Sequence, residues 1–449
     1  MKYILCFIIF LKLNYAYANN HIDKIIKANP RTSISIQIKD LKTDKEVYAY
    51  RPYRLMIPAS VTKTFTAYAA LEFLKPNFKY KTEILIEENS NLYFKLSGDP
   101  TLTLDHLNEL VKKIPKDKTW NIFVDDFIFD QNYSANGRSF EDNKFCFSSP
   151  TSAISINLNC FKAVLKPGNA VGYKAILKLS SKVFANIENE IITKNDPSCA
   201  PNLITKEDNS YYLSGCIDIN SKEIPLNIAY QDPRLMIKSM INYLLNNNKI
   251  KYKGIITFKP SLNQSNILAK HISKNLSLII DIMLKDSDNL IANNIAKTIA
   301  FYYFKSQGNF TNATKAIDKI LSAKTNIKFS ELRIFDGSGE SRYNLIAADQ
   351  LVDLCISAYN NKYIWNYFYK SLPIISVDGT LKHKFKEKPE FHGRIRAKTG
   401  HMGGVSTLAG FIDNKYAFAI MINGSADSKD HLLKLEDTLL SIILETFAD

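Results

Sequence analysis

Hydrophobic and polar residues alternate in the chain soon after residue 30. Ser33 to Ile38 alternates strictly and, after a polar turn at Lys42 to Lys45, Glu46 to Tyr50 forms a second β-like run. A period of two is typical of a strand with one buried face, so the two runs predict a β-hairpin. Pro58 then precedes Ala59 to Leu74, whose apolar residues recur at helical spacing and predict a helix.

The pattern changes between Pro76 and Ser261. Short β-like runs are separated there by Asn, Asp, Gly and Pro, which predicts one or two β-rich domains. The clearest runs are Thr82 to Ile86, Leu92 to Leu96, Ile122 to Val124 and Ala175 to Leu179.

Helical spacing returns at Leu276 to Leu284 and, after a polar break at Lys285-Asp286, at Ser287 to Phe304. The last part of the chain predicts three strands and a helix. These are Gly393 to Lys398, Val405 to Ile412, Tyr416 to Ile422 and, for the helix, about Lys429 to Ala448. Regions of mixed helix and strand therefore bracket a β-rich middle, as if the middle were inserted into one domain.

The first eighteen residues predict a cleavable export signal. Lys2 precedes a short apolar run, and the segment ends in Ala16-Tyr17-Ala18, a pattern typical of a cleavage site. The run is too short to span a bilayer, and Cys6 lies before most of it, which argues against a membrane anchor and a lipoprotein signal. We expect a mature chain that starts at Asn19, secreted across the inner membrane into the periplasm.

The chain is strongly basic, with a formal net charge of +14 at pH 7. For an exported protein such a charge favours a membrane surface or a cell-wall polymer over nucleic acid. No zinc-finger spacing and no aromatic RNA-recognition signature occurs, so we expect no nucleic-acid partner. The basic surface leaves peripheral membrane contact open.

Disulfides are permitted in an exported protein. Cys199 with Cys216 is a candidate pair and Cys146 with Cys160 is another, although connectivity cannot be read from sequence. Cys355 lies in an apolar helical pattern and is expected to be a buried thiol. No C-x-x-C or H-E-x-x-H spacing occurs, so we expect neither a metal nor a cofactor.

Ser60-Val61-Thr62-Lys63 places a hydroxyl and an amine three positions apart, on one face of the predicted helix. A serine at a helix start lies at the positive end of the helix dipole, which favours developing negative charge. Lysine can act as a base only if its pKa is lowered, by burial or by a neighbouring cation. By itself the spacing is also typical of an N-cap serine followed by a solvated lysine, but S-x-x-K occurs only once in the chain.

Two further motifs carry polar side chains. Lys398-Thr399-Gly400 follows a strand-like run, where lysine and threonine could hold a carboxylate and glycine would let a substrate backbone come close. S-x-N occurs several times, but only Ser287-Asp288-Asn289 falls at a break between two apolar helical runs, where side chains can project into a cleft.

In the order S-x-x-K, S-D-N, K-T-G these motifs resemble the signature of penicillin-recognising enzymes. Other stretches narrow the resemblance to the D-alanyl-D-alanine carboxypeptidase/endopeptidase family, the class C low-molecular-mass penicillin-binding proteins. The matching stretches are Ile57 to Lys63, Gly98 to Thr103, Asp336 to Gly339, Ser341 to Asn344 and Val377 to Leu381.

The resemblance implies an α/β (α+β) transpeptidase-like catalytic domain, with an antiparallel sheet flanked by helices and two inserted β-rich domains. The long stretch between Ser60 and Ser287 also requires a large insertion. We expect the catalytic domain at 19–75 and 262–449, inserted domain II at 76–165 and 226–261, and inserted domain III at 166–225.

The resemblance also implies roles for single residues. Ser60 would be the nucleophile and Lys63 its base, while Ser287 would relay the proton. Asn289 would orient the acyl amide, and Lys398 and Thr399 would bind the terminal carboxylate. In the family a threonine or serine commonly follows K-T-G; here His401 does, and its backbone N–H, with that of Ser60, would form the oxyanion hole. The expected partners are peptidoglycan stem peptides, with β-lactams as inhibitors.

Two other functions share parts of this pattern. A serine β-lactamase has the same three motifs, but the long insertion disfavours it. A non-catalytic wall-binding protein on a degenerate scaffold is disfavoured because all the expected functional side chains are present. A G-x-S-x-G hydrolase is not supported, since that pentapeptide is absent. The sequence does not decide between carboxypeptidase and endopeptidase activity.

Overall fold

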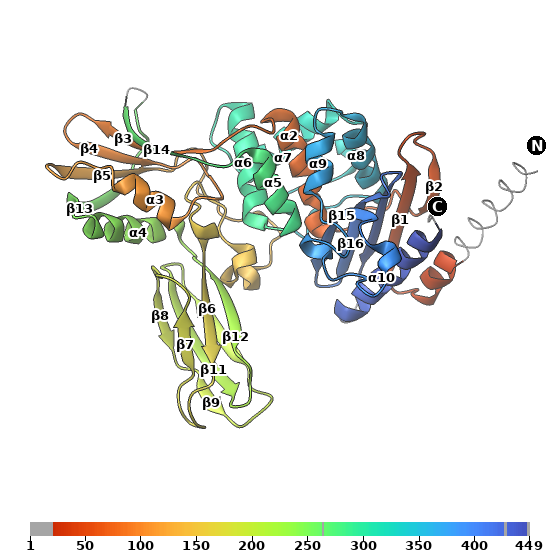
Figure 1. The fold of residues 1–449 in the computed structure, drawn as a ribbon, viewed down its shortest axis with the longest axis horizontal. Coiled ribbons are helices and arrows are strands. Elements are labelled where there is room, and N and C mark those ends of the chain that lie inside the picture. The colour runs from red at the N-terminus through yellow and green to blue at the C-terminus, as the bar shows by residue number, and fades with distance from the viewer. Residues whose placement is uncertain (1–20, 263–264, 426–428, 447–449) are drawn as a thin grey trace, which may run out of the picture. The chain divides into compact units, whose positions relative to one another are not determined.

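The computed structural model describes residues 21–262, 265–425 and 429–446 (Figure 1). The chain divides into two compact units. The first comprises Met1–Pro76, Ile280–Asp288 and Thr314–Asp449, and the second comprises Asn77–Ile279 and Asn289–Ala313. The predicted export signal and the cleavage site before Asn19 lie outside the described residues.

The first unit contains a five-stranded antiparallel sheet with the order β15-β16-β17-β1-β2. Its strands are β1 (Ser33–Asp40), β2 (Glu46–Tyr50), β15 (Ile395–Met402), β16 (Val405–Ile412) and β17 (Tyr416–Asn423). Ser33 of β1 lies opposite Asn423 of β17. The predicted hairpin and the predicted C-terminal strands therefore share one sheet, as the insertion hypothesis requires.

Helices flank this sheet. Every residue of β16 and β17 is buried, so both faces of these strands are covered. On one face, Leu435 and Leu439 of α10 (Lys429–Thr446) share a core with Ile36 of β1. The helix α8 (Ala348–Asn360), whose residues are not part of that core, contacts β1, β16 and β17. The helix α2 (Lys63–Phe73) packs against α9 (Trp365–Ser371) and directly follows the 3-10 turn Ala59–Thr62.

The second unit is built mainly of strands. One sheet has the order β13-β5-β4-β3-β14, a second has the order β12-β6-β7, and a third has the order β10-β11-β8 with β9 also paired to β11. The strands are β3 (Lys81–Glu87), β4 (Asn91–Lys95), β5 (Thr119–Asp125), β6 (Cys160–Lys166), β7 (Ile176–Leu179), β8 (Asn186–Asn189), β9 (Ile192–Lys194), β10 (Pro201–Thr205), β11 (Ser210–Asp218), β12 (Ile224–Ala229), β13 (Lys251–Phe258) and β14 (Asn266–Ile272).

Two helices of this unit were not predicted. The helix α3 (Leu104–Val111) is capped by Thr103, whose side chain accepts a hydrogen bond from a backbone N–H of the first turn. The helix α4 (Pro233–Asn247) starts with proline, and Asp232 caps it in the same way. An acidic cap followed by proline is a helix start signal, so α4 could have been found from the sequence.

The predicted break between helices is confirmed, because α5 (Leu276–Lys285) ends before Ser287 and α6 (Asn289–Phe304) begins after it. Two further helices, α7 (Phe310–Ser322) and α9, were not predicted. Short 3-10 turns occupy Phe140–Lys144, Cys146–Ser148, Asn157–Asn159, Phe329–Glu331, Gly379–Leu381 and Pro389–Phe391.

Both candidate disulfides form. Cys146 is bonded to Cys160, and Cys199 to Cys216, with Cα atoms 5.4 and 5.1 Å apart. Cys355 is a free and buried thiol in α8, as predicted. Both disulfides lie in the second unit, so covalent links stabilise its small sheets.

One strand boundary differs from that expected. The strand β15 continues to Met402, so K-T-G lies inside a strand and not after its end. The second compact unit begins at Asn77 and comprises Asn77–Ile279 and Asn289–Ala313, while the expected boundaries of the catalytic domain stay a prediction. The expected division of the insertion into domains II and III stays a prediction.

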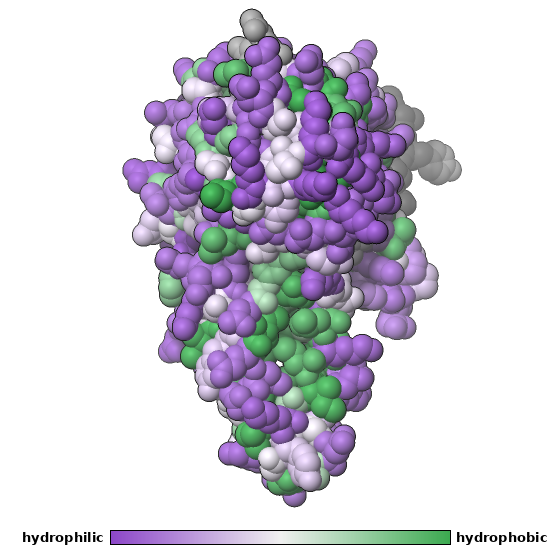
Figure 2. Space-filling view, turned by 90° about the vertical axis from the view of Figure 1, so that its left-hand side faces the viewer, coloured by the Kyte–Doolittle hydropathy of each residue, from purple (hydrophilic) through white to green (hydrophobic). Residues whose placement is uncertain are grey.

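Hydrophilic residues cover much of the face that Figure 2 draws, and hydrophobic residues gather in the lower part of that view.

Within the described ranges, no helix is both long enough and apolar enough to cross a membrane.

Candidate active site

Ser60 and Lys63 lie side by side at the start of α2. The Nζ atom of Lys63 is 3.0 Å from the Oγ atom of Ser60. Ser60 belongs to the 3-10 turn before the helix, and the preceding residue, Ala59, has a left-handed backbone with φ 48°. That conformation is uncommon for a residue with a side chain and must be held by its surroundings. The predicted pairing of the hydroxyl and the amine is therefore present.

Lys63 is completely buried. Burial lowers the pKa of Lys63 to about 8, although the carboxylates of Glu340, Asp336 and Asp288 raise it. A lysine with such a pKa is partly neutral near physiological pH, and a neutral amine can accept a proton from a hydroxyl. The environment thus supplies the condition that general-base action by Lys63 requires.

The D-G-S-G segment (Asp336 to Gly339) fixes the amine from the other side. The backbone oxygen of Ser338 accepts a hydrogen bond from Lys63 Nζ at 2.7 Å, and that of Gly337 accepts one from Thr66 of α2. Gly339 has φ 87°, and a Cβ atom there would collide with the carbonyl oxygen of Ala59. Only glycine allows this close approach beside the nucleophile.

Sequence reasoning matched this segment to the family but gave it no role. Its function in the structure is to place a carbonyl oxygen against the amine of Lys63. A backbone acceptor leaves no residue-specific signal, so only the glycine spacing could have pointed to it.

Ser287 and Lys398 meet although they are far apart in the sequence. The Nζ atom of Lys398 donates to the Oγ atom of Ser287 at 2.9 Å and to the backbone oxygen of Thr399 at 2.7 Å. Burial, together with the charge of Lys63, lowers the pKa of Lys398 well below its usual value. A bound carboxylate would offset both effects, so this site is suited to an anionic ligand.

The other K-T-G residues lie along β15. The hydroxyl of Thr399 donates to the hydroxyl of Thr380 at 2.8 Å, a contact that the sequence did not predict. A Cβ atom on Gly400 would lie 2.7 Å from the oxygen of Pro58 and 2.9 Å from the nitrogen of Ser60. The strand therefore runs directly against the nucleophile's backbone. His401 follows on β15, opposite Ser406 of β16.

Asn289 is the first residue of α6 and belongs to the second unit. Its Nδ2 atom donates to the backbone oxygen of Phe147 at 2.7 Å. Phe147 follows Cys146, so a disulfide anchors the segment that receives the amide. The sequence gave no signal for this contact, because 142 positions separate the two residues.

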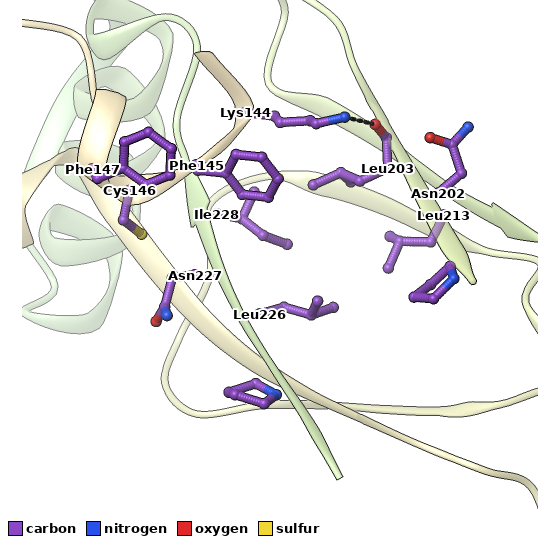
Figure 3. Close-up of a pocket in the computed structure, with 12 residues that line it drawn as sticks. Lys144, Phe145, Cys146, Phe147, Asn202, Leu203, Leu213, Leu226, Asn227 and Ile228 are labelled. Atoms are coloured by element: carbon purple, nitrogen blue, oxygen red, sulfur yellow. Dashed lines mark hydrogen bonds between the residues drawn. The ribbon is translucent and has the colours of Figure 1, made fainter. Parts of the chain in front are cut away.

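The same segment forms one wall of a pocket of about 490 Å³ in the second unit, shown in Figure 3. Phe145 and Phe147 stack with ring centroids 5.6 Å apart, and Lys144 donates to the backbone oxygen of Leu203. The opposite walls come from β10, β11 and β12. The pocket therefore borders the chain segment that holds Asn289.

In the part of the chain that the structure describes, no three His, Cys, Asp or Glu side chains gather in a way that could hold a metal ion. The assembled groups are hydroxyls, two lysines and backbone amides. Such a set suits acyl transfer through a serine ester.

Comparisons with known proteins agree with this chemistry. The model of the D-Ala-D-Ala carboxypeptidase 3 (S13) family matches residues 18–439. The D-alanyl-D-alanine carboxypeptidase DacB of Haemophilus influenzae is 29% identical over 432 residues, which cover 91% of this chain and 89% of that protein.

Two solved structures are also similar to this chain. The crystal structure of penicillin binding protein 4 (dacB) from H. influenzae has a TM-score of 0.85 at 27% identity, and the match covers 94% of this chain and 99% of that one. The structure described as its complex with a novel beta-lactam has a TM-score of 0.79 at 26% identity, with the same coverage. The predicted fold class is confirmed. The chain belongs to the D-Ala-D-Ala carboxypeptidase 3 (S13) family and is a serine hydrolase of that kind.

Proposed function

We propose that Ser60 is the nucleophile with which this D-alanyl-D-alanine carboxypeptidase/endopeptidase cleaves peptidoglycan stem peptides in the periplasm. The observation that carries the proposal is the 3.0 Å contact between Ser60 Oγ and the fully buried amine of Lys63. The apolar run and the Ala16-Tyr17-Ala18 sequence at the start of the chain support export.

In the acylation step, Ser60 Oγ attacks the carbonyl carbon of the penultimate D-alanine. Its proton passes to neutral Lys63, and the carbonyl oxygen becomes an oxyanion that accepts hydrogen bonds from the backbone N–H groups of Ser60 and His401. Loss of one such donor costs about 3 to 4 kcal/mol in comparable sites. Gly400 has no Cβ atom, and this lets β15 pack directly against the backbone of Ser60.

Collapse of the intermediate breaks the peptide bond. The leaving amine of the terminal D-alanine needs a proton, and Ser287 relays it. Water then attacks the ester on Ser60, which releases the shortened peptide and returns the free hydroxyl. The nucleophile thus passes through one covalent intermediate.

Substrate binding uses the remaining residues. Lys398 and Thr399 bind the terminal carboxylate, and the lowered pKa of Lys398 favours a ligand that restores its positive charge. Asn289 orients the acyl amide.

For the domain organisation we retain 19–75 and 262–449 as the catalytic domain, 76–165 and 226–261 as domain II, and 166–225 as domain III.

A β-lactam carries a carboxylate and a strained amide and so mimics the terminal dipeptide. It should acylate Ser60 and remain there because deacylation is slow. The complex of the H. influenzae protein with a beta-lactam supports this expectation for the present chain.

The test is incubation with a pentapeptide stem and with cross-linked muropeptides, followed by chromatography. Release of D-alanine from the pentapeptide demonstrates carboxypeptidase activity, and monomers formed from cross-linked dimers demonstrate endopeptidase activity. Rapid penicillin hydrolysis without either product would favour a β-lactamase, and binding without any turnover would favour a non-catalytic wall protein.

A further inference from the structure

A third carboxylate stands close to the Ser60 and Lys63 pair. The D-G-S-G segment ends at Gly339, and the next residue is Glu340. Glu340 is half-buried, in contrast to the fully exposed position expected for a glutamate in a loop. Gly339, the residue before Glu340, has a left-handed backbone and lies against the oxygen of Ala59, the neighbour of the nucleophile.

Glu340 contacts Ser338, the residue whose backbone oxygen accepts a hydrogen bond from Lys63. The Oγ atom of Ser338 shares its one hydrogen between Asp336 Oδ2 at 3.0 Å and Glu340 Oε2 at 3.3 Å, and the carbonyl oxygen of the same serine accepts from Lys63 Nζ at 2.7 Å. The backbone nitrogen of Glu340 in turn donates to Ser338 Oγ. A short chain of contacts therefore connects the carboxylate with the amine.

Other charged groups face Lys63 as well. Lys398 approaches from β15, Asp288 from the turn before α6, and Asp336 from the D-G-S-G segment. Asp336 accepts four hydrogen bonds, from the backbone of Gly339 and Ser341 and from the side chains of Ser338 and Asn344. These donors make Asp336 the centre of the segment's own fold. Glu340 exerts the largest effect of the three carboxylates on Lys63.

We propose that Glu340 is a positioning residue of the acylation step: through Ser338 it holds the backbone carbonyl that accepts a hydrogen bond from Lys63, and its negative charge acts on that base. This inference rests on the proposed role of Ser60 and Lys63. In this proposal Glu340 acts through the base and takes no part in the bond changes.

The sign of the effect follows from electrostatics. A carboxylate stabilises the protonated amine, so Glu340 raises the pKa of Lys63 against the lowering by burial. Removing the charge makes the amine neutral at lower pH. The acylation rate rises with pH as Lys63 loses its proton, and in a variant without this charge that rise should occur at lower pH. At a pH below the pKa of Lys63, acylation should therefore be faster than in the unaltered protein.

Glu340→Gln tests the charge, because glutamine keeps an acceptor oxygen for Ser338 Oγ at nearly the same size. Glu340→Asp keeps the charge on a shorter side chain. Glu331→Gln is the matched control: Glu331 is exposed, lies in the same stretch of chain and pairs with the exposed Lys328. Circular dichroism should first establish that each variant is folded.

The measurement is the second-order rate constant of acylation by a fluorescent penicillin, between about pH 5 and pH 9. For Glu340→Gln we expect the acid limb to move down by about half a pH unit or more, which is about threefold faster acylation below the limb. Glu331→Gln should follow the unaltered protein, and Glu340→Asp should stay closer to it than Glu340→Gln does.

Two outcomes would overturn the inference. One is an acid limb of Glu340→Gln that stays in place or moves up. The other is a lower plateau without any shift, since that is the signature of a purely structural role. Absence of acylation in the unaltered protein at every pH would instead contradict the proposed function itself.

Discussion

The amine of Lys398 donates a hydrogen bond to the hydroxyl of Ser287 at 2.9 Å, across 111 positions of the chain. This bond joins the K-T-G strand β15 to the turn between α5 and α6. Ser287 has a left-handed backbone, with φ 59°, which is uncommon for a residue other than glycine. Its surroundings hold this conformation, as is frequent at functional sites.

Lys398 binds a ligand in this account and takes no part in forming the ester. We therefore expect Lys398→Ala to lower D-alanine release from a pentapeptide by about tenfold or more, because the terminal carboxylate loses its cation. Slow covalent labelling by penicillin should persist, since Ser60 and Lys63 remain. Lys382→Ala, at an exposed lysine, is the control and should change neither rate. Complete loss of labelling in Lys398→Ala would argue that this lysine also activates the nucleophile.

Lys63 should give the pH profile of kcat/KM a rising limb, and Lys398 should give it a falling limb. Burial lowers the pKa of Lys63 to about 8, and its neutral form is the base, so acylation should rise as pH increases towards and through that value. Lys398 must be protonated to hold a carboxylate, and burial lowers its pKa well below the usual value, so substrate affinity should fall as pH rises through that lowered pKa. We expect a bell-shaped kcat/KM for D-alanine release. A rate that does not change between about pH 6 and pH 9 would contradict both assignments.

Gly400 lies so close to Ser60 that adding one methyl group, in Gly400→Ala, should slow acylation. A Cβ atom at residue 400 would lie 2.9 Å from the nitrogen of Ser60, the proposed oxyanion donor, so Gly400→Ala should reduce acylation by about a hundredfold or more. Gly403→Ala is the matched control: its Cβ would meet only the end of the Arg342 side chain, at 3.2 Å. Equal acylation rates in the two variants would show that the strand need not approach the nucleophile this closely.

The two disulfides predict different consequences of reduction. Replacing Cys146 and Cys160 by serine should loosen the segment that holds Asn289 through Phe147, and so slow acylation several-fold. Replacing Cys199 and Cys216 should cost similar stability, roughly 3 kcal/mol by the chain-entropy model, but leave acylation unchanged. Denaturant unfolding and penicillin acylation measure the two effects. Equal acylation in both double variants would contradict the proposed coupling to Asn289.

The sequence predicted the parts of the fold that depend on local pattern. The alternation at Ser33 to Ile38, the helix after Pro58 and the break at Lys285-Asp286 all reappear at nearly the expected positions. The order of the three motifs, with the family resemblance that they carry, singled out Ser60, Lys63, Ser287 and Lys398, whose roles stay predictions. The structure places these four within the first unit.

Features that depend on long-range packing were missed. The strand β15 extends through K-T-G because β16 pairs with it up to Met402, which periodicity at Arg394 to Ala397 could not reveal. The acceptor for Lys63 is a backbone carbonyl, that of Ser338, and any residue type carries one. The amide of Asn289 finds its partner in a distant segment for the same reason.

The most direct test of the account is to identify the acylated residue. After reaction with penicillin, proteolysis and mass spectrometry should find the adduct on Ser60 alone, and Ser60→Ala should show neither adduct nor D-alanine release, because no other group can form the ester. Lys63→Ala should come close to the serine variant, with acylation lowered by about 10² to 10⁴-fold. An adduct on another serine, or undiminished D-alanine release from Ser60→Ala, would contradict the account.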